Sequence, residues 1–76
     1  MTNAELTVGL RGYTRRRPFR PFVIEFVSGA QVEVNHPDGV ASFGRLFLFR
    51  GRGSSRSVFA ASSVCRLLDP VPPNVA

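Results

Sequence analysis

The alternation of side chains between residues 22 and 34 constrains the fold of this chain more than any other feature. In "FVIEFVSGAQVEV", Phe22, Ile24 and Phe26 recur with a period of two, and the return run repeats the pattern. Such a period places every second side chain on the same face of a β-strand. Gly29 lies between the two runs, where a tight turn needs a residue that adopts positive φ at little cost. The stretch therefore predicts a β-hairpin.

A short helix is predicted over residues 2–13, before the hairpin. Thr2 and Glu5 have the spacing of a capping box, in which each residue satisfies a backbone N–H of the other. Leu6, Leu10 and Tyr13 then fall on one side of a helix. A helix this short needs a surface to pack against, so we expect this apolar stripe to contact the rest of the fold.

Pro18 and Pro21 end the helical pattern and favour an extended segment that leads into the first strand. After the hairpin, residues 35–39 (Asn-His-Pro-Asp-Gly) have the composition of a turn. Three further strands and two connecting segments are predicted downstream. They are a third strand over residues 45–50, a flexible basic loop over 51–57, a fourth strand over 58–60, a helical turn over 61–63 and a fifth strand over 64–68.

These elements predict a mainly β fold with one domain over residues 1–69, followed by a Pro-rich flexible tail over residues 70–76. A short N-terminal helix before five short strands outlines a small five-stranded antiparallel barrel, of the Sm-like or the Src-homology-3-like type. An open five-stranded sheet with the helix across one end is the structural alternative. A chain of 76 residues buries only about 60% of its unfolded surface, so we expect it to gain stability as a homo-oligomer, joined through an edge strand and the "RLFLF" surface.

The chain carries a formal net charge of +5, and all ten of its basic residues are arginines. Such a charge favours polyanionic partners, and the planar guanidinium suits phosphate. Codon usage in a GC-rich genome explains an arginine-rich composition equally well. The placement of the arginines is therefore more informative than their number.

Two groups of arginines are candidate nucleic-acid-binding residues. The first group lies within "RRRPFRPF" and includes one further arginine from the predicted helix. The second group lies within "RGRGSSR". Arginine interleaved with glycine is typical of sequence-tolerant contacts to a single strand. The alternative for both groups is a solvated surface, with Phe19 and Phe22 fixing the first segment to the fold. The candidate residues are Arg11, Arg15, Arg16, Arg17 and Arg20 in the first group, and Arg50, Arg52 and Arg56 in the second.

The aromatic residues of the third strand region distinguish two kinds of partner. Phe43, Phe47 and Phe49 are either core residues or stacking platforms for bases. One of them exposed beside Arg45 or Arg50 would favour nucleic acid. A bare edge strand with an apolar groove would favour a protein partner, bound as an acidic segment or as an added strand.

Nothing in the sequence favours catalysis, a cofactor or a metal site. His36 and Asp38 are the only candidate acid–base pair, and no nucleophile motif accompanies them. Cys65 is the single cysteine, expected in a strand, buried and inert. No targeting segment or membrane span is evident, so a cytoplasmic protein is expected. The predicted function is non-catalytic binding of nucleic acid, with RNA or single strands preferred over duplex DNA. The alternative is a protein-interaction module that binds an acidic partner or a strand at its open sheet edge.

Two resemblances accompany this prediction. The hairpin "FVIEFVSGAQVEV" resembles the first hairpin of Sm-like proteins, which implies a barrel that assembles edge to edge and binds RNA. The chain departs from that family after the second strand, where it has "NHPD". More of the chain, "RPFRPFVIEF", "SGAQVEVNHPDGV" and "SVFAASSVCRLLD", is similar to short uncharacterised bacterial proteins that are frequent in planctomycetes. This second resemblance supports the fold and implies no chemistry.

Overall fold

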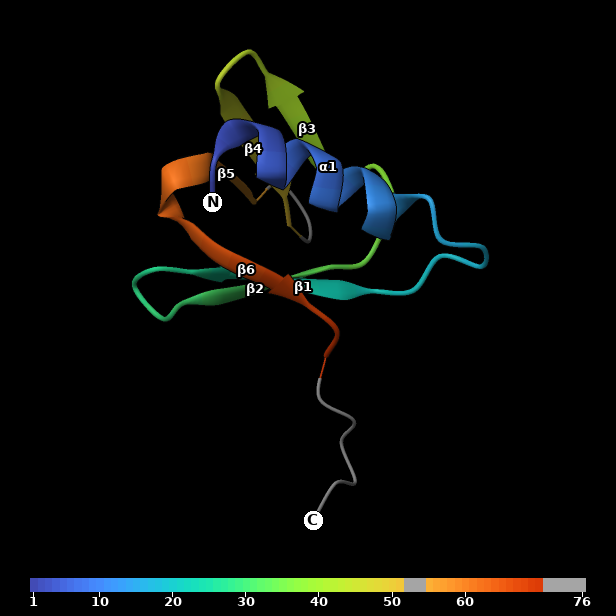
Figure 1. Ribbon diagram of the computed structural model, residues 1–76. Coiled ribbons are helices and arrows are strands. Elements are labelled where there is room, and N and C mark those ends of the chain that lie inside the picture. The colour runs from blue at the N-terminus through green and yellow to red at the C-terminus, as the bar shows by residue number, and fades with distance from the viewer. Residues whose placement is uncertain (52–54, 71–76) are drawn as a thin grey trace.

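The computed structural model describes residues 1–51 and 55–70, and these residues form one α-helix, one 3₁₀ turn and six strands (Figure 1). The coarse prediction, a mainly β fold with an N-terminal helix, is confirmed. The elements are α1 (Asn3–Thr14), β1 (Phe22–Phe26), β2 (Gln31–Val34), β3 (Val40–Phe43), β4 (Leu46–Arg50), β5 (Arg56–Ala60), η1 (Ala61–Ser63) and β6 (Val64–Leu68). No described helix is long and apolar enough to cross a membrane.

Helix α1 begins at the predicted capping box. The backbone N–H of Glu5 donates to Thr2 Oγ1 over 3.0 Å, and the backbone N–H of Thr2 donates to Glu5 Oε1 over 2.8 Å. Two of the four N–H groups that a helix start leaves open are satisfied in this way. Leu6 and Leu10 are buried and Tyr13 packs against the core, so the predicted apolar stripe is the face that docks.

The predicted hairpin is formed by β1 and β2. Their register pairs Phe22 with Val34 and Ile24 with Val32, which places the larger apolar side chains on one face. Gly29 has a φ of 93° in the connecting turn, a conformation that costs an L-residue with a side chain considerably more than glycine. The turn is closed by the N–H of Gly29, which donates to the carbonyl of Phe26 over 2.9 Å.

The strands pair into two antiparallel sheets rather than one. The first has the order β2-β1-β6 and the second the order β3-β4-β5. Among the described residues no strand pairing joins the two sheets, so the expected five-stranded barrel is not confirmed. The chain passes between the sheets twice, through the turn after β2 and through η1 after β5, and α1 lies beside both sheets in Figure 1.

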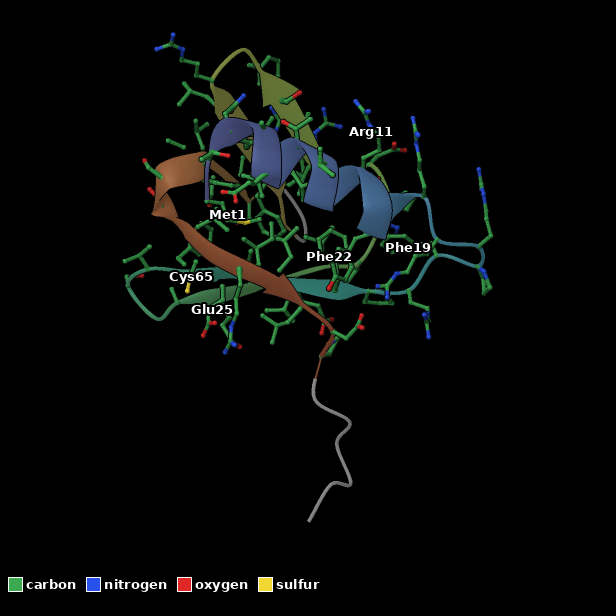
Figure 2. All side chains as sticks on the ribbon, viewed as in Figure 1. Met1, Arg11, Phe19, Phe22, Glu25 and Cys65 are labelled. Carbon is green, nitrogen blue, oxygen red and sulfur yellow. The ribbon has the colours of Figure 1, made fainter. Side chains whose placement is uncertain are left out.

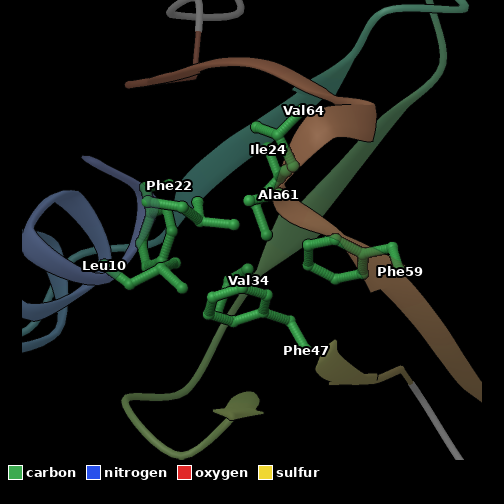
Figure 3. Packing of buried hydrophobic residues seen from close by; sticks show 9 residues of the cluster. Leu10, Phe22, Ile24, Val34, Phe47, Phe59, Ala61 and Val64 are labelled. Atoms are coloured by element: carbon green, nitrogen blue, oxygen red, sulfur yellow. The ribbon is translucent and has the colours of Figure 1, made fainter. Parts of the chain in front are cut away.

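One hydrophobic core lies between the helix and the two sheets (Figure 3). Phe47 of β4 and Phe59 of β5 stack with ring centroids 5.8 Å apart, and Phe26 of β1 meets the Phe59 ring edge-on at 5.2 Å. Side chains from both sheets therefore share the same interior. The buried members of this core are Leu6, Leu10, Phe22, Ile24, Val34, Phe47, Phe59, Ala61 and Val64.

Two expectations about the later strands were wrong in detail. The segment after the turn, Val40–Phe43, is a strand that the sequence pattern did not predict, and β5 starts at Arg56 rather than at Val58. Both additions pair with β4, which hydrogen-bonds to β3 on one side and to β5 on the other. Cys65 lies in the predicted strand but is exposed, because Val64 occupies the inward position and the next side chain points outward.

Candidate nucleic-acid interface

The segment between α1 and β1 carries the first group of arginines and is fastened to the fold by its aromatic residues. Phe22 is fully buried and lies 4.9 Å from the ring of Tyr13, and Phe19 meets Phe22 edge-on at 6.4 Å. The Arg17–Pro18 peptide bond is cis. Arg11 and Phe19 lie toward one end of the molecule, whereas Met1 and Cys65 lie toward the other (Figure 2).

Arg16 is the member of this group that makes contacts within the fold. Its Nη1 donates to Asp69 Oδ1 over 2.8 Å, and its Nη2 donates to the carbonyl of Arg20 over 3.1 Å. The guanidinium carbon lies 4.7 Å from the centre of the Tyr13 ring, within the range of a cation–π contact. Arg16 thus joins the end of α1 to the end of β6, and its charge is already matched by Asp69.

The other arginines of the first group have no carboxylate partner among the described residues. Arg11, Arg15, Arg17 and Arg20 are all exposed, and none of them makes an ion pair within residues 1–51 and 55–70. Arg15 is the C-cap residue of α1, and Arg11 occupies the last turn. Cations are favourable at this end of a helix, so the position stabilises them without neutralising them.

A hollow of about 280 Å³ lies between α1 and the edge strand β3. Arg11 and Arg15 line it from the helix, Pro37 lines it from the turn, and Ala41 lines it from β3. We call this the Arg11 hollow. On one side it offers two guanidinium groups that form no ion pair within the described part of the chain, and on the other mostly uncharged groups. This arrangement suits an anionic group carried on a larger ligand.

In the second group, Arg50 and Arg56 lie directly opposite each other on β4 and β5. Both are exposed, and no described carboxylate pairs with either. Like charges directly opposite on neighbouring strands destabilise a sheet. The pair therefore presents an unfavourable positive potential that a bound anion would relieve. Arg52 lies outside the described residues.

A second, larger hollow of about 790 Å³ adjoins this pair. Phe49 and Arg50 line it from β4, Ser55 lines it from just before β5, and Asn35 and His36 line it from the segment after β2. We call this the Arg50 hollow. It combines a cation, a half-buried aromatic ring and hydrogen-bonding groups, a mixture that suits a nucleotide, and it also contains the carboxylate of Glu33.

The two hollows adjoin the same turn. His36 and Gly39 line the Arg50 hollow, and Pro37 between them lines the Arg11 hollow. The N–H of Gly39 donates to the carbonyl of His36 over 3.0 Å, and the carbonyl of Gly39 accepts from the N–H of Arg50 over 2.8 Å. A Cβ at position 39 would lie 2.9 Å from Val34 Cγ1, so the close approach requires glycine. The turn therefore fixes the backbone of Arg50 beside it, and Arg11 and Arg15 lie across the Arg11 hollow from Pro37.

The carboxylates are distributed unevenly around these arginines. Glu5 caps α1, Glu25 pairs with Arg66 and Asp69 pairs with Arg16. The remaining two, Glu33 and Asp38, are exposed and form no ion pair among the described residues. Glu33 lines the Arg50 hollow and Asp38 lies in the turn, so both oppose an anion bound there.

The Glu25–Arg66 pair predicts a contribution to stability that depends on pH. The hydrogen bond from Arg66, and next that from Gln31, lower the pKa of Glu25 below its ordinary value of 4.5. A carboxyl whose pKa is lower in the folded state stabilises the fold above its unfolded pKa, and this stabilisation is lost as pH falls through the folded pKa. The wild type is therefore expected to have a higher melting temperature than Glu25→Gln at pH ~7. At pH ~2 the two proteins are expected to have the same melting temperature. Equal melting temperatures at neutral pH would contradict the pairing.

The three phenylalanines in question have three different environments. Phe47 is 1% exposed and belongs to the core, as expected for an aromatic residue in a strand. Phe49 is half-buried beside Arg50 and lines its hollow. Phe43 is 60% exposed, two residues from Arg45. An exposed aromatic residue two positions from an arginine favours nucleic acid. The edge strands β2, β6, β3 and β5 supply one part of the condition for a protein partner, which also requires an apolar groove.

His36 and Asp38 are exposed, and their side chains form no hydrogen bond to any residue in the described ranges. Within those ranges, no three His, Cys, Asp or Glu side chains are close enough together to hold a metal ion. What the site offers chemically is a set of cations and hydrogen-bonding groups at the surface.

No family model matches the chain, and neither the curated proteins nor the solved structures contain a match to it. The resemblances to Sm-like proteins and to the short bacterial proteins remain predictions.

Proposed function

We propose that this protein binds single-stranded nucleic acid, RNA or DNA, without catalysing a reaction, along a path that crosses the turn at residues 36–39. Phosphates of the strand contact Arg11, Arg15, Arg17 and Arg20 on one side of the turn and Arg50 and Arg56 on the other. The single observation that supports this most strongly is the Arg50–Arg56 pair, which forms no ion pair among the described residues and lies beside a hollow that contains an aromatic ring.

A single strand suits this surface better than a duplex. The basic groups lie on separate elements, and the hollows beside them are separated by a turn that includes Pro37. A flexible strand bends over such a feature, whereas a duplex presents its phosphates on a stiff cylinder. The half-buried ring of Phe49 lines the Arg50 hollow, where an unpaired base can stack, whereas a duplex keeps its bases within its own stack.

The fold that we propose with this function is the small barrel of the Sm-like or Src-homology-3-like type. Its support is the single core that side chains of both sheets share, together with the two places where the chain crosses between the sheets. A cytoplasmic location belongs to the same proposal, since an RNA or single-stranded DNA ligand is found there.

The experiment that tests this function compares three fluorescently labelled probes of mixed sequence: RNA, single-stranded DNA and duplex DNA. Anisotropy titrations at ~50 mM salt are expected to show binding to the two single strands that is at least about tenfold tighter than to the duplex. Failure of all three probes to bind at this low salt would contradict the proposed function. Equal binding of the duplex would contradict the path across the turn.

Removal of the acidic residue in the turn is expected to strengthen binding of nucleic acid. Asp38→Asn removes a negative charge from the proposed path, so it is expected to tighten binding of single-stranded RNA by about threefold to tenfold at ~50 mM salt. The control is Glu5→Gln, which changes the net charge equally at the far end of α1 and keeps an oxygen for the capping box. If both variants tighten binding to the same extent, the strand does not cross the turn.

A further inference from the structure

The outer face of the β3-β4-β5 sheet is apolar at its centre. The register places Phe43 opposite Leu46 and Leu48 opposite Val58, with their side chains pointing away from buried Phe47. Phe43, Leu46 and Val58 are 60%, 47% and 62% exposed. We call these four residues, with Ala41 and Ala60 beside them, the apolar face. Contiguous exposed apolar surface of this kind marks an interaction site more often than isolated exposed residues do.

Arginines border the apolar face at both ends. Arg45 lies in the turn between β3 and β4, and the Arg50–Arg56 pair lies at the other end of β4 and β5. The strands β3, β4 and β5 contain no Asp or Glu. The outer face of the other sheet is different, since Glu25 pairs with Arg66 there and also accepts a hydrogen bond from Gln31. The unmatched positive border is therefore particular to one of the two sheets.

We propose that the apolar face binds an amphipathic helical segment of a partner protein, with an aliphatic stripe and with Asp or Glu on both sides of it. The aliphatic stripe covers Leu46, Leu48 and Val58, and the carboxylates meet Arg45 at one end and the Arg50–Arg56 pair at the other. Charge complementarity at both ends fixes the partner's chemistry, because any partner that covers this face approaches these arginines. This inference goes beyond the proposed function and does not depend on it.

A second copy of the chain fits the apolar face poorly. Two copies related by a two-fold axis would present the same surface to each other. With the strands of the two copies aligned, arginines at the ends of one face would meet arginines of the other, and like charges brought together in an interface are destabilising. Nucleic acid also fits it poorly, since only Phe43 among these residues has the flat ring on which a base stacks.

The probe that tests the proposal is a synthetic helical peptide of about 20 residues with a leucine stripe bordered by glutamates. Its matched control has the same stripe bordered by lysines. The amide spectrum of the ¹⁵N-labelled protein is expected to change only at β3, β4, β5 and their connecting turn, with a Kd near ~10⁻⁵ M for the glutamate peptide. The lysine peptide is expected to bind at least about tenfold more weakly.

Two single substitutions test whether the peptide binds at the apolar face or at any exposed apolar side chain. Val58→Glu places a charge at the centre of the face and is expected to reduce binding of the glutamate peptide by at least about tenfold. Val8→Glu changes another exposed valine, on α1, and is expected to leave it unchanged. Both positions are more than 60% exposed, so both variants are expected to keep the melting temperature of the wild type.

Three results would overturn the proposal. The first is equal binding of the glutamate and lysine peptides, or no binding of either. The second is a concentration-dependent dimer, measured by analytical ultracentrifugation, that Val58→Glu abolishes, since a second copy would then occupy the face. The third is a change at the same amides on addition of single-stranded RNA, with no response to the glutamate peptide. The first two results are obtained without nucleic acid, so they do not depend on whether a single strand binds at Arg50 and Arg56.

Discussion

Phe22→Ala is expected to remove a large part of the stability of the fold. Phe22 has no solvent exposure and contacts the rings of both Tyr13 and Phe19, so it joins α1 and the arginine segment to the first sheet. Removal of a buried phenylalanine ring costs about 3–5 kcal/mol. A domain of this length has a total stability of about 4–11 kcal/mol. We therefore expect the melting temperature to fall by about 15–30 °C.

Phe43→Ala is the matched control for this loss. The substitution is chemically identical, but Phe43 is 60% exposed on the outer face of the second sheet. Its expected effect is within about 0.5 kcal/mol. Circular dichroism during heating measures both variants against the wild type. A similar fall in melting temperature for the two variants would contradict the positions of the two phenylalanines.

Exchange of Arg11, Arg15, Arg17 and Arg20 for glutamine is expected to weaken binding of single-stranded RNA by about 10²- to 10³-fold at ~0.1 M salt. The estimate follows from counterion release, in which each phosphate contact contributes about fivefold in affinity to a single strand at that salt concentration. The stability of the fold is expected to change little, because all four side chains are exposed and form no ion pair among the described residues. Anisotropy measures the affinity, and thermal melting confirms the folded state.

Single substitutions show whether position or charge alone causes this effect. Arg15→Gln is expected to cost about fivefold in affinity, and Arg45→Gln less than about twofold. Arg45 precedes β4, and Arg50 ends it, so five residues of extended chain, about 17 Å, separate them. This separation exceeds the Debye length of about 10 Å at 0.1 M salt. Equal losses for the two variants would indicate attraction by net charge and not a defined path.

Local patterns in the sequence were sufficient to predict α1, the hairpin and β6. The capping box of Thr2 and Glu5 and the turn at Gly29 act between residues that are close in the chain, so their geometry follows from spacing alone. Strand β4 was also predicted, as the third strand over residues 45–50, because "LFLF" is apolar on both faces. Interactions between residues close together in the chain determine elements of this kind.

The elements that the sequence did not predict depend on a partner strand. Val40–Phe43 has little alternation of its own, and Arg56 and Ser57 read as the end of a polar loop. Both segments become strands because β4 offers them backbone hydrogen-bonding groups. The same limit applies to the division into two sheets, which depends on contacts between residues far apart in the sequence.

The candidate arginines could be found from the sequence, but their ion pairs and their positions relative to one another could not. Arg16 and Arg17 are neighbours in an apparently uniform basic run, yet only Arg16 pairs with Asp69, which lies 53 positions later in the chain. The opposition of Arg50 and Arg56 likewise depends on the register of β4 and β5. The two hollows and their common turn arise from the arrangement of α1 and the sheets, for which the sequence contains no local signal.

The central claim is that phosphates of a single strand contact arginines on both sides of the turn, and the salt dependence of binding tests it most directly. Affinity for single-stranded RNA is measured from ~50 to ~200 mM salt for the wild type and for the variant that lacks Arg11, Arg15, Arg17 and Arg20. Six contacts predict a slope of about −4 for log affinity against log salt, and the two contacts left in the variant predict about −1.4. A wild-type slope near zero, or the same slope for both proteins, would contradict the claim.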